Sequence, residues 1–267
     1  ASFTEVGGMH VEVYPTEAEV AAKLNQMVLE YAAECVRMKG AFSLGSPGGK
    51  IPTMLAALPG LPGATQVDWT KVHLYFVNER QNEGKCCKLN RSSFADALGI
   101  PAENIHAPIG GESSDSAAAY DASLRAAPLQ VVSPTQGGTA PRLDMVLVGL
   151  GNDGHIGSVY PGSDTATVYS ADSLALPVDK PGKQSITLSL SMMAAATYTI
   201  IATCGEAKAD AVAAAVRLSA ESAEWTPNDT MTPVPWLDAP AARLATGPGE
   251  LFWLLDPAAA SKLSFDS

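Results

Sequence analysis

The chain has 267 residues, of which 46% are apolar, and this is enough to bury one sizeable core. Its formal net charge of −11 disfavours nucleic acid and anionic membranes as partners, so an anionic ligand would need a local cluster of cations. No apolar run reaches the roughly 18 residues of a membrane span, and no signal-peptide pattern opens the chain, so we expect a cytoplasmic protein.

Hydrophobic spacing in the first half of the chain predicts helices that alternate with short strands. Residues 16–39 place apolar side chains at three- and four-residue steps, which predicts an amphipathic helix with a capping box at Thr16 and Glu19. The apolar run Ala41–Leu44 predicts a strand that ends in a glycine-rich turn. Further along, the pattern predicts a strand over 72–77 and helices over 53–58, 88–98 and 114–127.

The second half continues this alternation. Strands are predicted at Met145–Val148 and at Tyr198–Ala202, and the second of them leads through Gly205 into a helix over 206–220. The last apolar segment, Leu251–Leu263, predicts a closing helix. The segments 128–142 and 221–240 are rich in Pro, Ser, Thr and Gly, which predicts surface loops.

Strands that alternate with helices predict an α/β fold with a mainly parallel sheet and helices on both faces. No internal repeat or flexible linker divides the chain, so we expect residues 1–267 to form a single α/β domain. Ligands bind such sheets at the carboxyl ends of the strands. Polar residues that directly follow the predicted strands are therefore the candidate site residues.

The segment after Met145–Val148 carries a G-x-G-x-x-G motif at residues 149–154 and then His155. The motif matches the dinucleotide-binding fingerprint, but Pro161 follows too soon for the long helix which that site requires. The glycine turn instead brings Asp153 and His155 to a strand end. Because an imidazole accepts a proton near neutral pH, His155 is the candidate general base, with a structural histidine as the alternative.

Two further strand ends suggest an anion site. The turn at Gly45 and Ser46 does not match a Walker loop. Only three residues separate Gly45 from the Gly-Lys pair, where a Walker loop has four, and Ile51 follows in place of Ser or Thr. Its backbone N–H groups could still bind one phosphate, although an ordinary turn is the alternative. Arg80 follows the strand over 72–77 and is well placed to bind a phosphate through its guanidinium, unless it is an ion-paired surface charge.

A third strand end carries Lys208, which could supply a second cation or be a solvated lysine in the first turn of a helix. Metal and cofactor signals are missing from the sequence. Neither C-x-x-C nor H-x-x-x-H spacing occurs, so we expect no metal and no cofactor. The same lack of pairing predicts that the cysteines are free thiols, at positions 35, 86, 87 and 204.

The segment 144–162 resembles the signature of the 6-phosphogluconolactonases, which belong to the glucosamine-6-phosphate isomerase/6-phosphogluconolactonase superfamily. Ala41–Ala56, the strand end 78–80 with Asn90, the segment 205–208 and the segment 249–256 fit the same family in the same order. The chain departs from the family pattern in the turn at residues 44–48, and it has Asn78 where an aspartate is common.

This resemblance implies a Rossmann-like fold of the sugar-phosphate isomerase/lactonase type. It implies hydrolysis of 6-phospho-D-glucono-1,5-lactone to 6-phosphogluconate, in the oxidative pentose phosphate pathway, by a monomer that binds a small sugar phosphate. In that reaction His155 would activate water, with Asp153 beside it. The phosphate would be held by Arg80, Lys208, Gly45 and Ser46.

Two other functions are compatible with the same fold. A deaminating isomerase of amino-sugar phosphates needs additional carboxylates near the histidine, and Ile156–Tyr160 contains none. A non-catalytic sugar-phosphate sensor would keep Arg80 and Lys208 without needing His155. Such sensors usually carry a DNA-binding helical segment, and the acidic charge without a basic arm argues against one. The sequence therefore favours the lactonase.

Overall fold

A computed structural model describes the chain except for residues 109, 135–140, 171, 181–182, 222–234 and 265–267. Its main sheet consists of β1 (Ser2–Val6), β2 (Met9–Val13), β3 (Phe42–Ser46), β4 (Val72–Phe76), β6 (Ile105–His106), β9 (Met145–Val148), β12 (Tyr198–Thr203) and β13 (Glu250–Leu255). The strand order is β1-β2-β13-β12-β9-β3-β4-β6. Every neighbouring pair is parallel except β1 with β2, so the predicted mainly parallel sheet is confirmed.

Two small antiparallel sheets accompany the main one. The first has the order β10-β11-β5 and consists of β5 (Asn78–Arg80), β10 (Ala175–Lys180) and β11 (Lys183–Leu188). The second pairs β7 (Ser133–Pro134) with β8 (Pro141–Arg142). Since β5 begins two residues after β4, the first small sheet extends directly from the carboxyl end of a main-sheet strand.

The α-helices are α1 (Glu17–Lys39), α2 (Lys50–Met54), α3 (Lys85–Asn90), α4 (Asp96–Leu98), α5 (Ser113–Ala126), α6 (Asp164–Thr167), α7 (Leu190–Ala194) and α8 (Ala209–Ala220). A π-helical turn, Arg91–Ala95, joins α3 to α4. Short 3₁₀ helices span Leu55–Gly60, Pro62–Gln66, Trp69–Lys71, Ala102–Asn104, Glu206–Lys208 and Pro240–Thr246. Thr16 caps α1 by accepting a hydrogen bond from the backbone N–H of Glu19, as its sequence predicts.

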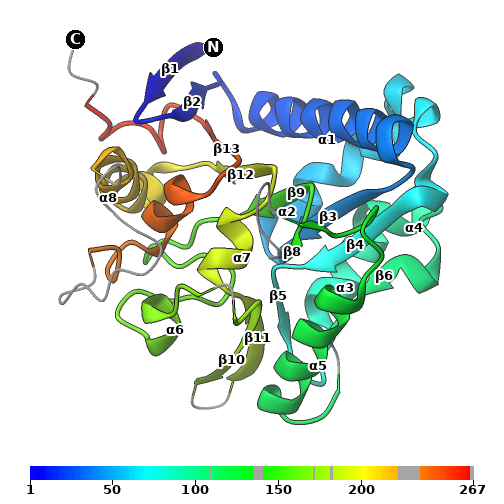
Figure 1. Cartoon of the computed structure of the whole chain (residues 1–267). Coiled ribbons are helices and arrows are strands. Elements are labelled where there is room, and N and C mark those ends of the chain that lie inside the picture. The colour runs from blue at the N-terminus through cyan, green and yellow to red at the C-terminus, as the bar shows by residue number, and fades with distance from the viewer. Residues whose placement is uncertain (109, 135–140, 171, 181–182, 222–234, 265–267) are drawn as a thin grey trace.

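Helices cover both faces of the main sheet, and α1 and α5 lie on opposite sides of β3 and β4 (Figure 1). One buried apolar cluster includes side chains of α1, α2 and α3, and the other includes side chains of α5, α7 and α8. Successive residues of β9 alternate between the clusters, with Met145 and Leu147 in the first and Val146 and Val148 in the second. A strand that is buried on both faces explains the continuous apolar run seen in the sequence.

The predicted closing helix over Leu251–Leu263 is wrong. Residues Glu250–Leu255 form β13, which pairs in parallel with β12 on one side and with β2 on the other. A short run of apolar residues fits a buried strand as well as a buried helix, and here the free backbone groups of both neighbouring strands favour the strand. The described residues after β13 form turns.

The two predicted surface loops are only partly correct. Val131 and Val132, within segment 128–142, are buried in the core. In segment 221–240, residues 222–234 lie outside the described part of the chain, whereas Trp236 is only 2% exposed and donates its indole N–H to the carbonyl of Ala166 at 2.8 Å. Segment 128–142 also contains the two-residue strands β7 and β8, and a loop-like composition could not predict which apolar side chains fill gaps in the core.

All four cysteines are free thiols, as their spacing predicts. Over the described residues, no helix has both the length and the apolar content that crossing a bilayer requires. The glycine motif at 149–154 is followed by turns, and α6 begins only at Asp164, which agrees with the argument against a dinucleotide fold.

Candidate active site

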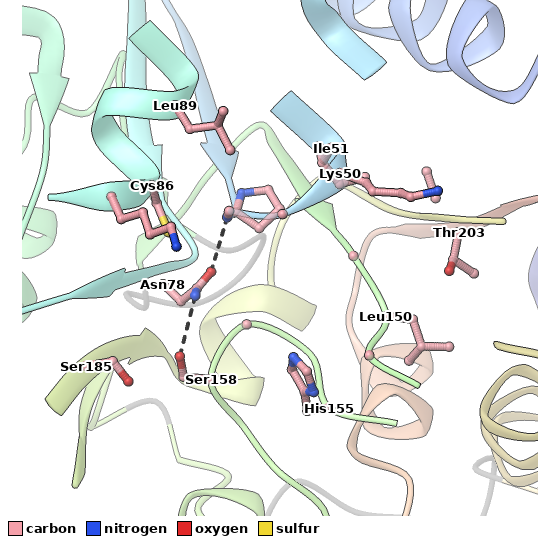
Figure 2. A pocket seen from close by; sticks show the side chains of 18 of the residues that line it. Lys50, Ile51, Asn78, Cys86, Leu89, Leu150, His155, Ser158, Ser185 and Thr203 are labelled. Atoms are coloured by element: carbon pink, nitrogen blue, oxygen red, sulfur yellow. Dashed lines mark hydrogen bonds between the residues drawn. The ribbon is translucent and has the colours of Figure 1, made fainter. Parts of the chain in front are cut away.

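A pocket of about 500 Å³ lies beyond the carboxyl ends of β3, β9 and β12, and it is shown in Figure 2. This is the edge where parallel α/β sheets bind ligands. The pocket is lined by Pro47, Gly48, Gly49, Lys50, Ile51, Met54, Asn78, Arg80, Lys85, Cys86, Leu89, Gly149, Leu150, Gly151, His155, Gly157, Ser158, Tyr160, Val178, Ser185, Ala202, Thr203, Cys204 and Lys208. His155, Arg80 and Lys208, predicted from separate parts of the sequence, are therefore brought together.

The charged side chains among the described lining residues of this pocket are all cations. Its lining includes the cations Lys50, Arg80, Lys85 and Lys208, and none of the described lining residues is an aspartate or a glutamate. The whole chain, by contrast, has a net charge of −11. A cationic, carboxylate-free cavity in an acidic protein concentrates anions locally, so the pocket suits an anionic ligand.

Two glycines allow the loop after β9 to place His155 in the pocket. Gly151 donates its N–H to the carbonyl of His155 at 2.8 Å, and Gly154 adopts a left-handed conformation with φ of 86°. A Cβ atom on Gly151 would overlap both the His155 ring and the Asp153 carboxylate. The tight turn therefore requires glycine at both positions.

Asp153 orients the His155 ring. The distance from His155 Nδ1 to Asp153 Oδ1 is 2.5 Å, and the same oxygen accepts the backbone N–H of His155 at 3.2 Å. Partial burial raises the pKa of Asp153, but the hydrogen bonds from His155 outweigh it and the pKa is lowered. An ionised Asp153 keeps the proton of the neutral ring on Nδ1, so Nε2 is the nitrogen available to accept a proton.

Asp153 itself does not line the pocket, and its side chain is 60% exposed, compared with 34% for His155. The aromatic ring of Tyr160 packs near the imidazole, with 4.8 Å between the ring centroids. Asp153 therefore lies behind the imidazole as seen from the pocket, while Tyr160 contributes to the pocket wall beside it.

Gly45 and Ser46 do not line the pocket. Both lie within β3, where a Cβ on Gly45 would press on Leu143 and Val146, and where Ser46 donates its hydroxyl to Asn90 Oδ1 at 2.6 Å. The pocket wall starts one residue later, with the backbone of 47–49. Because β3 runs two residues further than the predicted strand Ala41–Leu44, the glycine turn that faces the pocket is shifted along the chain.

Asn78 connects the glycine turn to the histidine loop. Its Oδ1 accepts the backbone N–H of Gly48 at 3.4 Å, and its Nδ2 donates to Ser158 Oγ at 3.5 Å, as Figure 2 shows. An amide can donate and accept at the same time, whereas a carboxylate only accepts. The neutral Asn78 thus links two walls of the pocket without adding a negative charge.

Buried Glu79 organises the loop between β5 and α3. Its carboxylate accepts three backbone N–H groups, from Arg80 at 2.8 Å, Cys86 at 2.9 Å and Cys87 at 2.7 Å. The loop is thereby folded back onto its own start, which places Arg80 and Lys85 together along the pocket. The guanidinium of Arg80 also lies 3.6 Å from the carboxylate of Glu83.

Lys208, which follows β12, contacts the loop that carries His155. It ends the 3₁₀ turn after β12, and its Nζ donates to the carbonyl of Leu150 at 2.5 Å. Burial and then the nearby charge of Lys50 lower the pKa of Lys208, against the opposing effect of Asp153. A bound anion would compensate this crowding of positive charge.

Several lining residues carry no recognisable signal in the sequence. Lys85 has no motif around it, and it reaches the pocket only because the loop folds back. Ser185 and Val178 come from the β10–β11 hairpin, which the sequence argument did not predict. The described residues include no group of three or more His, Cys, Asp or Glu side chains that could hold a metal ion.

Comparison with known proteins gives the family. The profile of the family described as glucosamine-6-phosphate isomerases/6-phosphogluconolactonase matches residues 15–253. The chain is 31% identical over 264 residues to "Probable 6-phosphogluconolactonase 2" of Arabidopsis thaliana, covering 94% of both chains. It is 29% identical over 260 residues to the 6-phosphogluconolactonase of a Nostoc strain, covering 95% of this chain and 98% of that protein.

Solved structures show the same fold. The 6-phosphogluconolactonase from Trypanosoma cruzi superposes with a TM-score of 0.74 at 17% identity, covering 99% of this chain and 100% of that one. A structure of the devB protein gives a TM-score of 0.71 at 23% identity, covering 95% and 99%. Taken with the profile match and the pocket at the strand ends, these likenesses show that the chain belongs to the glucosamine-6-phosphate isomerase/6-phosphogluconolactonase family.

Proposed function

We propose that the protein hydrolyses 6-phospho-D-glucono-1,5-lactone to 6-phosphogluconate, the second step of the oxidative pentose phosphate pathway. The relatives named as 6-phosphogluconolactonases support this substrate. The observation that carries the proposal is the composition of the pocket, where a histidine oriented by a carboxylate lies among four cations and no described acid lines the wall. Those are the groups that an anionic ester needs for attack by water.

In the proposed reaction, His155 Nε2 takes a proton from a water molecule as that water attacks the carbonyl carbon of the lactone. The tetrahedral intermediate then expels the ring oxygen, the ring carbon–oxygen bond breaks, and the imidazolium returns its proton to that oxygen. The products are a carboxylic acid, which ionises, and a hydroxyl group. Asp153 stabilises the transient imidazolium and maintains its orientation.

The phosphate of the substrate is proposed to bind Arg80 and Lys208. The backbone N–H of Gly49 takes the part that the sequence assigned to Gly45 and Ser46, because the turn is what faces the pocket and the N–H of Gly48 is bound by Asn78. A ligand anchored by its distant phosphate has its reacting carbonyl held at one position, and this positioning contributes to the rate.

An isomerising deaminase of the same family is less well supported. Moving a proton between two sugar carbons requires an acid or base besides the histidine, and the described lining residues include no carboxylate. A sensor without catalysis would not need the oriented pair of Asp153 and His155. The observed groups are sufficient for hydrolysis of an activated ring ester, so we also propose that the enzyme uses no metal or cofactor. We separately propose that it works in the cytoplasm.

The test is a titration of acid release from freshly prepared 6-phosphogluconolactone at constant pH, measured against the spontaneous rate. We expect a rate well above the spontaneous one that scales with enzyme concentration. A parallel assay follows ammonia release from glucosamine 6-phosphate. Acid release at only the spontaneous rate, from protein shown to be folded, would refute the proposal, and ammonia release would instead identify an isomerase.

A further inference from the structure

Lys85 is a cation of the pocket that neither the sequence argument nor the proposed chemistry uses. Among the four lining cations, Lys50 pairs with Glu17 at 3.1 Å, Arg80 lies 3.6 Å from Glu83, and Lys208 donates to a backbone carbonyl. Within the described residues, the Lys85 ammonium makes no ion pair and no hydrogen bond. It is exposed and available to a ligand.

The backbone of Lys85 is held in place although its ammonium is free. Lys85 begins α3 after Gly84, which has a left-handed φ of 58°. The next two N–H groups, of Cys86 and Cys87, are both bound by the buried carboxylate of Glu79. That carboxylate also binds the N–H of Arg80, so a single buried group fixes the backbone at both cations.

The cations lie on two sides of the glycine turn. Figure 2 shows Cys86, which directly follows Lys85, on one side of the turn and Lys50 on the other. Arg80 and Lys85 stand at the two ends of the loop that Glu79 folds back, because its carboxylate accepts the N–H groups of Arg80, Cys86 and Cys87. Arg80 and Lys85 are therefore brought to the same part of the pocket lining.

We propose that Lys85 is a further phosphate-binding residue, which pairs with Arg80 to hold the substrate's phosphate and to select phosphorylated over unphosphorylated lactones. A phosphate dianion placed beside Arg80 is compensated only in part, because Glu83 shares the guanidinium. Lys85 is the neighbouring cation without a described carboxylate partner, so it supplies the missing positive charge. This inference rests on the proposed lactonase function.

Lys88 provides a matched control on the same helix. It is exposed and lies one turn after Lys85, but it does not line the pocket and its Nζ donates to the carbonyl of Glu83 at 2.7 Å. Lys85→Gln and Lys88→Gln remove the same charge from the same helix. A difference between the two variants therefore reports on the pocket and not on the net charge of the protein.

The experiment measures kcat and KM of both variants on 6-phosphogluconolactone and on glucono-1,5-lactone. For Lys85→Gln we expect kcat/KM on the phosphorylated lactone to fall about 5- to 20-fold, mainly through KM, and to fall far less on the unphosphorylated one. We expect Lys88→Gln to change either value less than about twofold. Lys85→Arg, which keeps the charge, restores most of the loss.

Equal effects of the Lys85 and Lys88 substitutions, or an equal loss on both lactones, would overturn the role of Lys85. Calorimetric binding of 6-phosphogluconate to wild type and Lys85→Gln gives an answer independent of turnover. A wild-type protein that does not hydrolyse the lactone refutes the proposed function, whereas unchanged product affinity in Lys85→Gln refutes only this inference.

Discussion

At the scale of single residues, the surroundings of the four histidines distinguish His155 from the others. His10 stacks on Phe252 with 4.5 Å between ring centroids, and His73 and His106 bond each other at 3.1 Å. Burial, and then the charge of His73, lowers the pKa of His106 to about 4. His155 alone among these four histidines both lines the pocket of about 500 Å³ and forms a hydrogen bond with an aspartate side chain. A general base needs both access to the substrate and a partner that sets its tautomer.

His155→Ala is therefore expected to lower kcat by about 100-fold or more while the protein stays folded, because the proton of the attacking water then has no acceptor. The measurement is acid release by the variant, with circular dichroism as the check on folding. His10→Ala is the control, since His10 pairs with Glu250 at 3.6 Å and does not line the pocket. Turnover near the wild-type rate in a folded His155→Ala protein would remove His155 from the mechanism.

At the scale of elements, two connections place His155, Arg80 and Lys85: the loop after β9 and the loop between β5 and α3. The first bends at Gly151 and Gly154, and the second is held by Glu79. Both begin at strand ends, so the sheet determines where each loop starts. The position of the functional side chain is then decided by backbone conformation and by a few buried hydrogen bonds.

Gly151→Ala tests the first loop. The added methyl group would overlap the His155 ring and the Asp153 carboxylate, so the pair must move. Because misplacement of a catalytic group by about 1 Å costs up to about 100-fold, we expect kcat to fall about 10- to 100-fold. Gly149→Ala is the comparison, since its methyl would meet only Ile51 at an ordinary 3.6 Å. Comparable kcat losses in the two variants would show that the spacing at Gly151 is not special.

Glu79→Gln tests the second loop. The amide replaces an oxygen that accepts an N–H by a nitrogen that is itself a donor, so at least one buried N–H loses its partner. We expect the free energy of unfolding to fall by about 1–3 kcal/mol, which thermal unfolding measures as a lower Tm. Glu83→Gln, in the same loop but exposed, should change stability by less than about 0.5 kcal/mol. Equal Tm values for the two variants would contradict the bracing role of Glu79.

At the scale of the whole molecule, a protein of net charge −11 keeps a cationic pocket at one edge of its sheet. The net negative charge repels polyanions, whereas the cations that line the pocket suit a small anion. The net charge acts on a partner at long range, and salt screens the field of exposed charges over about 10 Å, whereas the pocket cations act at contact distance.

We expect activity to need no added metal, nucleotide or nicotinamide, since an activated ring ester can be hydrolysed with a base and a bound water alone. The protein is dialysed against a strong chelator and then assayed for acid release without additions, with a mock-dialysed sample as the control. Full retention of activity is the expected result. Activity that disappears and returns only with zinc or another divalent ion would contradict the mechanism based on His155.

Several features were determined by the sequence alone because they depend on local interactions. The cap at Thr16 and the turn that carries His155 involve residues a few positions apart, and so their patterns are readable in one dimension. The same holds for β9, whose four apolar residues directly precede the glycine turn. The fold class followed from the alternation of such elements.

The remaining features were decided only by the tertiary structure. The run at Leu251–Leu255 is a strand because β2 and β12 leave backbone groups free on both of its sides, and no local pattern contains that information. Ser46 is withdrawn from the pocket by its bond to Asn90, 44 residues away. Lys85 reaches the pocket because Glu79 folds the loop back. Contacts between distant residues set these positions, and their free energies depend on which partners the fold brings within reach.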